Sequence, residues 1–81
     1  MRSDPKFLFG QRLTVLRKAR GWSQEALALE SGLARSYLGG VERGQRNISL
    51  VNICRLAETL QILPSELLLF DAKQLSTKRR A

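Results

Sequence analysis

The feature that most constrains the fold is a pair of short helical segments with a glycine between them, within residues 22–44. Ser23 is a favourable N-cap, which predicts a helix over residues 24–31. Gly32 suits the left-handed conformation that ends many helices. The chain can therefore turn within three residues and begin a second helix over residues 35–43.

The segment before this pair has the pattern of an amphipathic helix. Phe9, Leu13 and Leu16 recur at helical spacing, which predicts a helix from about Lys6 to Arg20. Gly21 follows as the expected stop signal.

Two more helical segments follow the pair. Ser49 can cap the first of them, and its expected buried face comprises Leu50, Ile53, Leu56, Ala57 and Leu60. Pro64 suits the first turn of the last helix. Because no segment alternates like a strand, the sequence predicts an all-α fold, a compact five-helix domain. We expect this domain to span residues 1–75 and to be followed by a basic, disordered tail at residues 76–81.

Composition narrows the function classes. Lys and Arg number 14 against 7 Asp and Glu, and the net charge of +7 favours a polyanionic partner such as nucleic acid or an anionic membrane. The absence of His and the single Cys54 argue against a zinc site, and we expect no metal, cofactor, small-molecule ligand or enzyme activity. Cys54 itself is expected in the core. The apolar run at residues 67–70 is too short to span a membrane, so we expect a cytoplasmic protein without a membrane partner.

A longer pattern surrounds the two central helices. Its parts are Trp22-Ser23-Gln24-Glu25-Ala26-Leu27-Ala28, Gly32, Tyr37-Leu38, Val41-Glu42-Arg43-Gly44, Ser49-Leu50 and Leu56-Ala57. With this pattern, residues 6–70 resemble the Cro and phage-repressor (XRE) family of helix-turn-helix DNA-binding domains. The resemblance implies a lambda-repressor-like fold whose second central helix, the recognition helix, enters the major groove of double-stranded DNA.

Within that family, the segment over residues 35–47 is similar to controller proteins of restriction-modification systems. The resemblance implies a sequence-specific transcriptional regulator. Two alternatives use the same fold: a phage-type repressor, and an antitoxin-like module that binds a protein partner.

The start of the recognition helix is expected to contact bases. Arg35 and Ser36 open this helix, and a guanidinium can bond guanine O6 and N7 together. A contact with phosphate alone is the alternative for Arg35. Gly39 and Gly40 each cost about 1 kcal/mol relative to Ala within a helix. By family position Gly40 is expected to face the groove, whereas Gly39 serves either close approach to DNA or packing on a neighbouring helix.

Other residues are expected to contact the sugar-phosphate backbone. Gln24 stands at a helix N-terminus, which favours anions. In the family, this Gln binds the DNA backbone and often braces the residue that matches Arg35. Tyr37 either bonds a phosphate or half-buries its ring. The remaining members of this group are Arg43, Arg46 and Asn47. An ordinary solvent-exposed surface is the alternative for Gln24 and for the loop residues.

The last predictions concern structure and assembly. By resemblance, Arg17 and Glu42 form a partly buried ion pair that fixes the recognition helix. One short recognition helix reads only a few base pairs, so we expect a homodimer on a pseudo-palindromic operator, where it blocks or recruits RNA polymerase. The expected dimer surface runs from the fifth helix to about Leu75 and includes Leu67, Leu68 and Phe70. The alternative is that these residues only close the core of the monomer.

Overall fold

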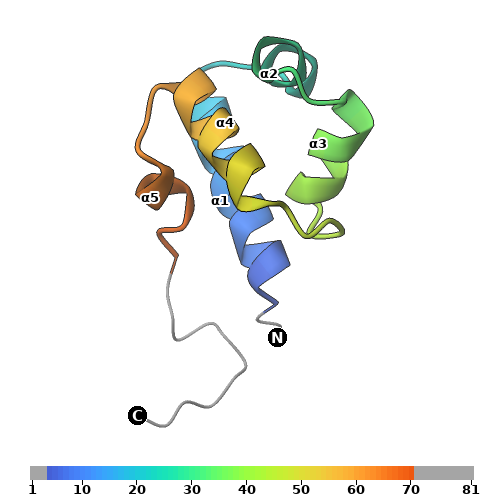
Figure 1. The fold of residues 1–81 in the computed structure, drawn as a ribbon, viewed down its shortest axis with the longest axis vertical. Helices are drawn as coiled ribbons and strands as arrows, with labels where there is room; N and C mark the ends of the chain where they lie inside the picture. The colour runs from blue at the N-terminus through green and yellow to red at the C-terminus, as the bar shows by residue number, and fades with distance from the viewer. Residues whose placement is uncertain (1–3, 71–81) are drawn as a thin grey trace, which may run out of the picture.

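Five helices form where the sequence places its caps and glycines. The computed structural model describes residues 4–70 and contains α1 (Pro5–Ala19), α2 (Gln24–Ser31), α3 (Arg35–Glu42), α4 (Leu50–Leu60) and α5 (Pro64–Leu67). Figure 1 shows α2 and α3 on one side of the bundle and α5 on the other. Residues 4–70 contain no strand, which confirms the all-α prediction. The predicted tail and the predicted dimer residues after Phe70 lie outside the described residues.

Single side chains fix the ends of these helices. Asp4, Ser23 and Ser49 cap α1, α2 and α4, each accepting a hydrogen bond from a backbone N–H in the first turn. Gly32 ends α2 with φ of 78°. Ala34 occupies the N-cap position of α3, and its side chain makes no capping hydrogen bond. The turn between α2 and α3 thus has the length and the glycine that the sequence predicts.

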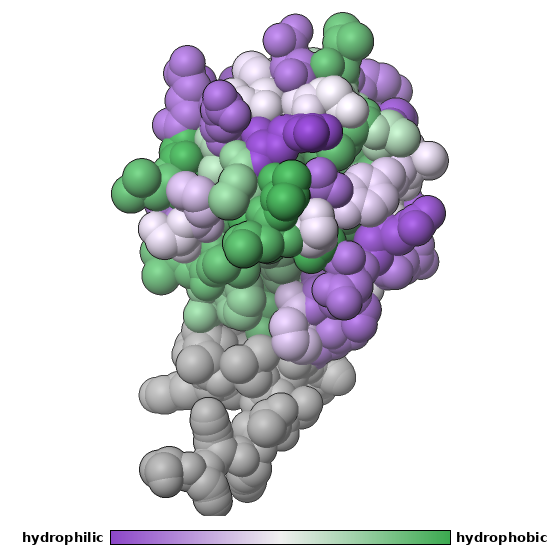
Figure 2. Space-filling view, viewed as in Figure 1, coloured by the Kyte–Doolittle hydropathy of each residue, from purple (hydrophilic) through white to green (hydrophobic). Residues whose placement is uncertain are grey.

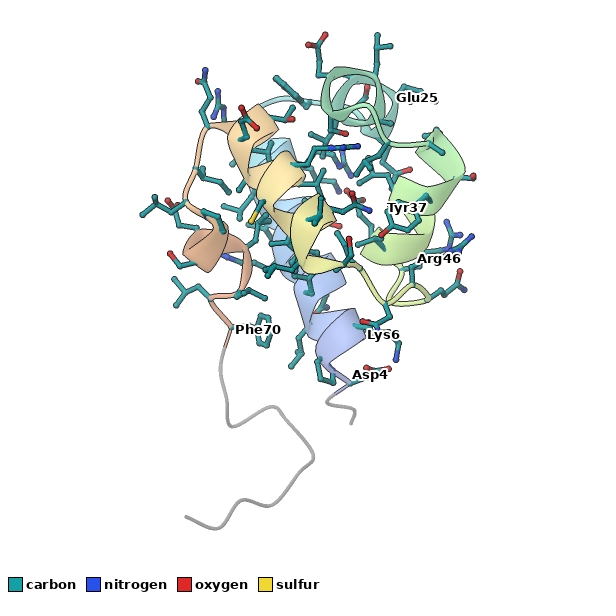
Figure 3. All side chains as sticks on the ribbon, in the orientation of Figure 1. Asp4, Lys6, Glu25, Tyr37, Arg46 and Phe70 are labelled. Atoms are coloured by element: carbon teal, nitrogen blue, oxygen red, sulfur yellow. The ribbon has the colours of Figure 1, made fainter. Side chains whose placement is uncertain are left out.

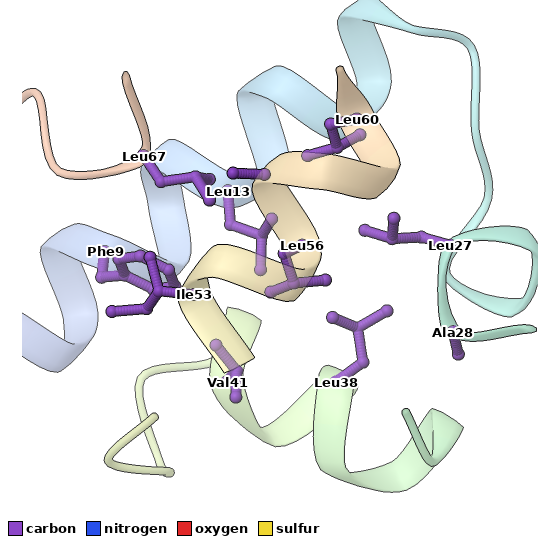
Figure 4. Close-up of a cluster of buried hydrophobic side chains, with 11 residues drawn as sticks. Phe9, Leu13, Leu27, Ala28, Leu38, Val41, Ile53, Leu56, Leu60 and Leu67 are labelled. Atoms are coloured by element: carbon purple, nitrogen blue, oxygen red, sulfur yellow. The ribbon is translucent and has the colours of Figure 1, made fainter. Parts of the chain in front are cut away.

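The core draws on all five helices. α3 packs on α1, α2 contacts α3 and α4, and α5 contacts α1 and α4. Figure 4 shows the buried side chains converging between them: Phe9, Leu13, Leu27, Ala28, Leu38, Val41, Ile53, Leu56, Ala57, Leu60 and Leu67. Within residues 4–70, none of the helices is long and apolar enough to cross a membrane.

Three sequence predictions about burial are wrong. Leu50 is 70% exposed, because it opens α4 beyond the cover of the core, and the buried stripe of that helix begins at Ile53. Cys54 is exposed because it lies directly after that stripe residue on the outer side of α4. Leu67 is fully buried, since it is the residue through which α5 joins the core. Its side chain therefore cannot contact a second protein at a dimer surface.

Gly10 brings α1 and α3 into close contact. A Cβ at this position would lie 2.5 Å from the carbonyl oxygens of both Val41 and Glu42. Real atoms cannot approach so closely, so the last turn of α3 rests on α1 only because residue 10 lacks a side chain. This contact sets the position of α3 at one end.

Candidate nucleic-acid interface

A buried ion pair joins α3 to α1. Arg17 donates through Nε to Glu42 Oε2 at 2.6 Å and through Nη2 to Oε1 at 3.0 Å. The two side chains are only 9% and 5% exposed. The same guanidinium donates through Nη1 to the carbonyl oxygen of Trp22, just before α2, at 2.8 Å. One arginine therefore connects three elements, and the ion pair that the resemblance implies is present.

Gln24 extends this network to α2. Its Nε2 donates to Glu42 Oε1 at 2.7 Å, so the amide braces Glu42, whereas the resemblance implies that it braces Arg35. An ionised carboxylate can accept hydrogen bonds but cannot donate them, so its partner in this bond must be the amide N–H of Gln24. Burial raises the pKa of Glu42, but hydrogen bonds from Arg17 and Gln24 and the charge of Arg17 outweigh it. The pKa of Glu42 consequently lies below its ordinary value, and its negative charge persists at neutral pH.

Arginine side chains cover the outward face of α3 and the loop after it. Arg35 Nε lies 3.7 Å from Glu25 Oε2 in an exposed ion pair. Arg43 Nε donates to Gln45 Oε1 at 3.1 Å. Arg46 is likewise exposed. This face carries three cations beside one exposed carboxylate, so it suits an anionic partner.

Tyr37 lies between α3 and α4, and Arg46 packs on it (Figure 3). The guanidinium carbon of Arg46 is 5.7 Å from the centroid of the ring. The ring is half-buried against the core, and its hydroxyl accepts a hydrogen bond from Asn52 Nδ2 at 3.2 Å. The ring of Tyr37 is thus half-buried, and the bond from Asn52 does not use its hydroxyl hydrogen.

Gly40 is not open to a base edge, contrary to expectation. It is buried, and Arg46 Cγ lies only 2.8 Å from the position that a Cβ of Gly40 would take. The aliphatic stem of Arg46 thus crosses the helix at the place that the sequence assigns to a close approach of DNA. A sequence pattern does not reveal how a loop side chain folds back over the helix before it.

The remaining predicted contact residues, Ser36 and Asn47, are exposed on α3 and the following loop. The guanidinium groups of Arg35, which opens α3, and Arg43, which caps its C-terminus, come together over Gly39. Leu68 and Phe70, which follow α5, line one pocket with Arg46 and Asn47. Asn52 was missed by sequence reasoning. It is a polar residue in the first turn of α4, and its spacing from Tyr37 carries no periodic signal.

The helix-turn-helix geometry is matched by a family model. The model described as helix-turn-helix matches residues 15–67, which include all of α2, α3, α4 and α5. The chain belongs to the helix-turn-helix family. Within this family, α2 and α3 correspond to the two helices of the motif, and α3 is the second of them.

Other members of the helix-turn-helix family show strong similarity. The control protein C.BamHI of Bacillus amyloliquefaciens is 41% identical over 71 residues, which cover 86% of this chain and 88% of that protein. The structure of the restriction-modification controller protein C.AhdI from Aeromonas hydrophila is 66% identical. Its TM-score is 0.75, over 76% of this chain and 94% of that one. The structure of SinR, the master regulator for biofilm formation, in complex with DNA is 34% identical. Its TM-score is 0.71, over 74% of this chain and 97% of that one.

Proposed function

We propose that this chain is a DNA-binding transcriptional regulator of the restriction-modification controller type, with α3 as its recognition helix. The observation that carries the proposal is the arginine-rich outward face of α3, held from behind by the buried pair of Arg17 and Glu42. A rigidly held helix with a basic face suits the major groove. The names of C.BamHI and C.AhdI, and the DNA in the SinR structure, support this assignment.

The exposed residues divide by their expected contacts. Arg35, in the first turn of α3, reads a guanine, and Ser36 beside it bonds a base edge. Gln24 gives one N–H to Glu42 and keeps a second N–H that a phosphate can accept. The other phosphate contacts are assigned to Tyr37, Arg43, Arg46 and Asn47. For Tyr37, the donor is the hydroxyl hydrogen, since its oxygen already accepts from Asn52.

A homodimer completes the proposal. Figure 2 shows hydrophobic residues gathered over α4 and α5 on one face, and the exposed ones there are Leu50, Val51, Leu63, Leu68 and Leu69. An exposed apolar surface of this kind favours association with a protein. We assign it to a second copy of the chain, because two half-sites need two recognition helices. Leu68 remains part of the proposed interface. Leu69, which is exposed, replaces Leu67, which is buried. Phe70 is half-buried, so only its exposed edge can contact a second copy.

Selection of bound sequences from a random DNA pool tests the function. We expect enrichment of a pseudo-palindrome with a guanine in each half-site and with half-site centres about 10 base pairs apart. Occupancy of such a site next to a promoter would block or recruit RNA polymerase. A pool without any enriched sequence would favour the antitoxin-like alternative, in which the fold binds a protein.

Two arginine variants test the assignment of contacts. Arg35→Ala should reduce the ratio of operator affinity to random-DNA affinity, because the guanine contact is lost. Arg46→Ala should weaken binding to both DNAs alike, and should reduce the slope of log affinity against log salt by about 0.9. Arg55→Ala is the matched control, since Arg55 is exposed on α4 and lines a different groove with Glu30 and Glu58. Equal weakening of both DNAs by the first two variants would overturn the role of Arg35.

A further inference from the structure

Gly39 occupies the middle of an arginine stripe on α3. Arg35 lies four residues before it and Arg43 four residues after it, so that one helix face carries all three. A glycine at this place costs about 1 kcal/mol of helix stability relative to Ala. The conformation of Gly39 is helical, so the residue is not needed for an unusual φ. Its advantage must lie in the space that it leaves.

That space is filled by the ends of polar side chains. Nη1 of Arg35 lies 3.0 Å, and Nη1 of Arg43 lies 3.1 Å, from the position that a Cβ of Gly39 would take. Gln24 Oε1 lies 3.7 Å from the same point. Gly39 is buried on an otherwise exposed face because these groups lie across its backbone. Gln24 belongs to α2, so the neighbouring-helix alternative for Gly39 holds for this one contact, while the two closer contacts come from arginines on its own helix face.

Each of the three groups is held from behind. Arg35 is paired with Glu25, and Arg43 donates to Gln45. The Nε2 of Gln24 is directed to Glu42, which turns its Oε1 toward Gly39. The two guanidinium groups thus lie over one place on the helix, where their positive charges are only partly neutralised. Donors that already lie near one another have less rearrangement to make when an acceptor binds.

We propose that Gly39 is a positioning residue that determines DNA specificity. Its missing side chain lets Arg35 and Arg43 act as one unit, with Arg35 on a guanine edge and Arg43 on the adjacent phosphate. A methyl group at residue 39 pushes both guanidinium groups outward, which spoils the bidentate geometry of Arg35. This inference rests on the proposed function and adds to it a residue that never touches DNA through a side chain of its own.

Gly39→Ala and Gly40→Ala form a matched pair of variants. Both remove a glycine from the same helix. The new methyl group meets the far ends of two arginine side chains at residue 39, and the stem of Arg46 at residue 40, where Cγ lies 2.8 Å away and must shift. In neither case is the nearest atom part of the backbone, and a cooperative thermal unfolding transition verifies that each variant folds. Gly39→Ala should lower the ratio of operator to random-DNA affinity by about tenfold, the contribution of one bidentate base contact. Gly40→Ala displaces Arg46, and should weaken both DNAs while preserving that ratio.

A double-mutant cycle separates positioning from a general structural effect. In the Arg35→Ala background, Gly39→Ala should change the ratio by less than about twofold, because the contact that it positions is already gone. Independent, multiplying losses would overturn the role of Gly39. So would an unchanged ratio for Gly39→Ala in a protein that selects its operator. The proposed function fails separately, if the unchanged protein shows no preference for any sequence.

Discussion

Glu42 is the residue on which the orientation of α3 depends. It lies in the last turn of that helix and accepts hydrogen bonds from Arg17 of α1 and Gln24 of α2. Its side chain is 5% exposed, so these protein groups replace almost all of its contact with water. A buried charge without its partner is much more unfavourable than a broken surface pair. The network therefore ties the fold and the candidate interface to the same few atoms.

Arg17→Ala tests this dependence through stability. The substitution leaves the Glu42 carboxylate buried without its cationic partner, with hydrogen bonds only from neutral side chains such as Gln24. We expect the free energy of unfolding to fall by about 3 kcal/mol or more, measured by urea denaturation at neutral pH. Arg55→Ala removes an exposed arginine and should stay within about 0.5 kcal/mol of the unchanged protein. Equal losses for the two variants would mean that the buried pair contributes no more than a surface pair.

The pKa of Glu42 predicts a second, pH-dependent effect. Its folded-state pKa lies below the ordinary 4.5 that it regains in the unfolded chain. The unfolded state therefore binds the proton first. The stabilisation by Glu42 is complete above about pH 4.5 and is lost as the pH falls through the lower, folded-state pKa.

Glu42→Gln should flatten this acid-side loss of stability, as measured by thermal unfolding from about pH 7 to about pH 3. Glu58→Gln alters an exposed carboxylate of α4 and should retain the slope of the unchanged protein. A Glu42→Gln profile that runs parallel to the other two would contradict the assigned pKa direction.

At the scale of helices, the contact between α1 and α3 depends on the absence of one side chain. Gly10→Ala would place a methyl carbon 2.5 Å from two carbonyl oxygens of α3. Because those atoms belong to the backbone, α3 must move as a whole. We expect a loss of about 1–3 kcal/mol in unfolding free energy, despite the better helix propensity of Ala. Gly39→Ala is the control and should be neutral or stabilising; similar losses for both would show that α3 is free to shift.

The helices themselves follow closely from local signals. Ser23, Gly32 and Ser49 each act over a few residues. α2 begins directly after Ser23 and ends directly before Gly32, and α4 begins directly after Ser49. Burial is harder to predict, because it depends on which neighbour covers each helix face. Leu50 continues the apolar stripe of α4 beyond that cover, whereas Leu67 in its short helix is completely enclosed.

The candidate site was predictable in its residues more than in its contacts. A pattern of amino acids indicates that Arg35, Arg46 and Tyr37 belong to one surface. It does not indicate that the stem of Arg46 crosses Gly40 or that Asn52 bonds the Tyr37 hydroxyl. These contacts join a helix to a loop and to a later helix. They follow from the tertiary fold, which periodicity within one segment cannot encode.

At the scale of the whole molecule, two different surfaces lie on different elements. The outward face of α3 is basic, and the surface of α4 and α5 is apolar. With the net charge of +7, nonspecific attraction to DNA acts on every copy of the chain. This attraction does not distinguish one DNA sequence from another. A second recognition helix at a fixed distance would double the number of base pairs read, and so would allow one operator to be selected. The proposed association through α4 and α5 would leave both α3 helices free for this task.

Leu69→Asp tests that division of the surface. Leu69 is 66% exposed after α5, and a carboxylate there should prevent a second copy from packing on it. We expect sedimentation to show monomers at concentrations where the unchanged protein is dimeric, and affinity for a full operator to fall to that for one half-site. Leu29→Asp changes a leucine of α2 that is 79% exposed, and should leave the dimer intact. If Leu69→Asp remained dimeric while Leu29→Asp dissociated, the second copy would have to bind through α2, beside the recognition helix.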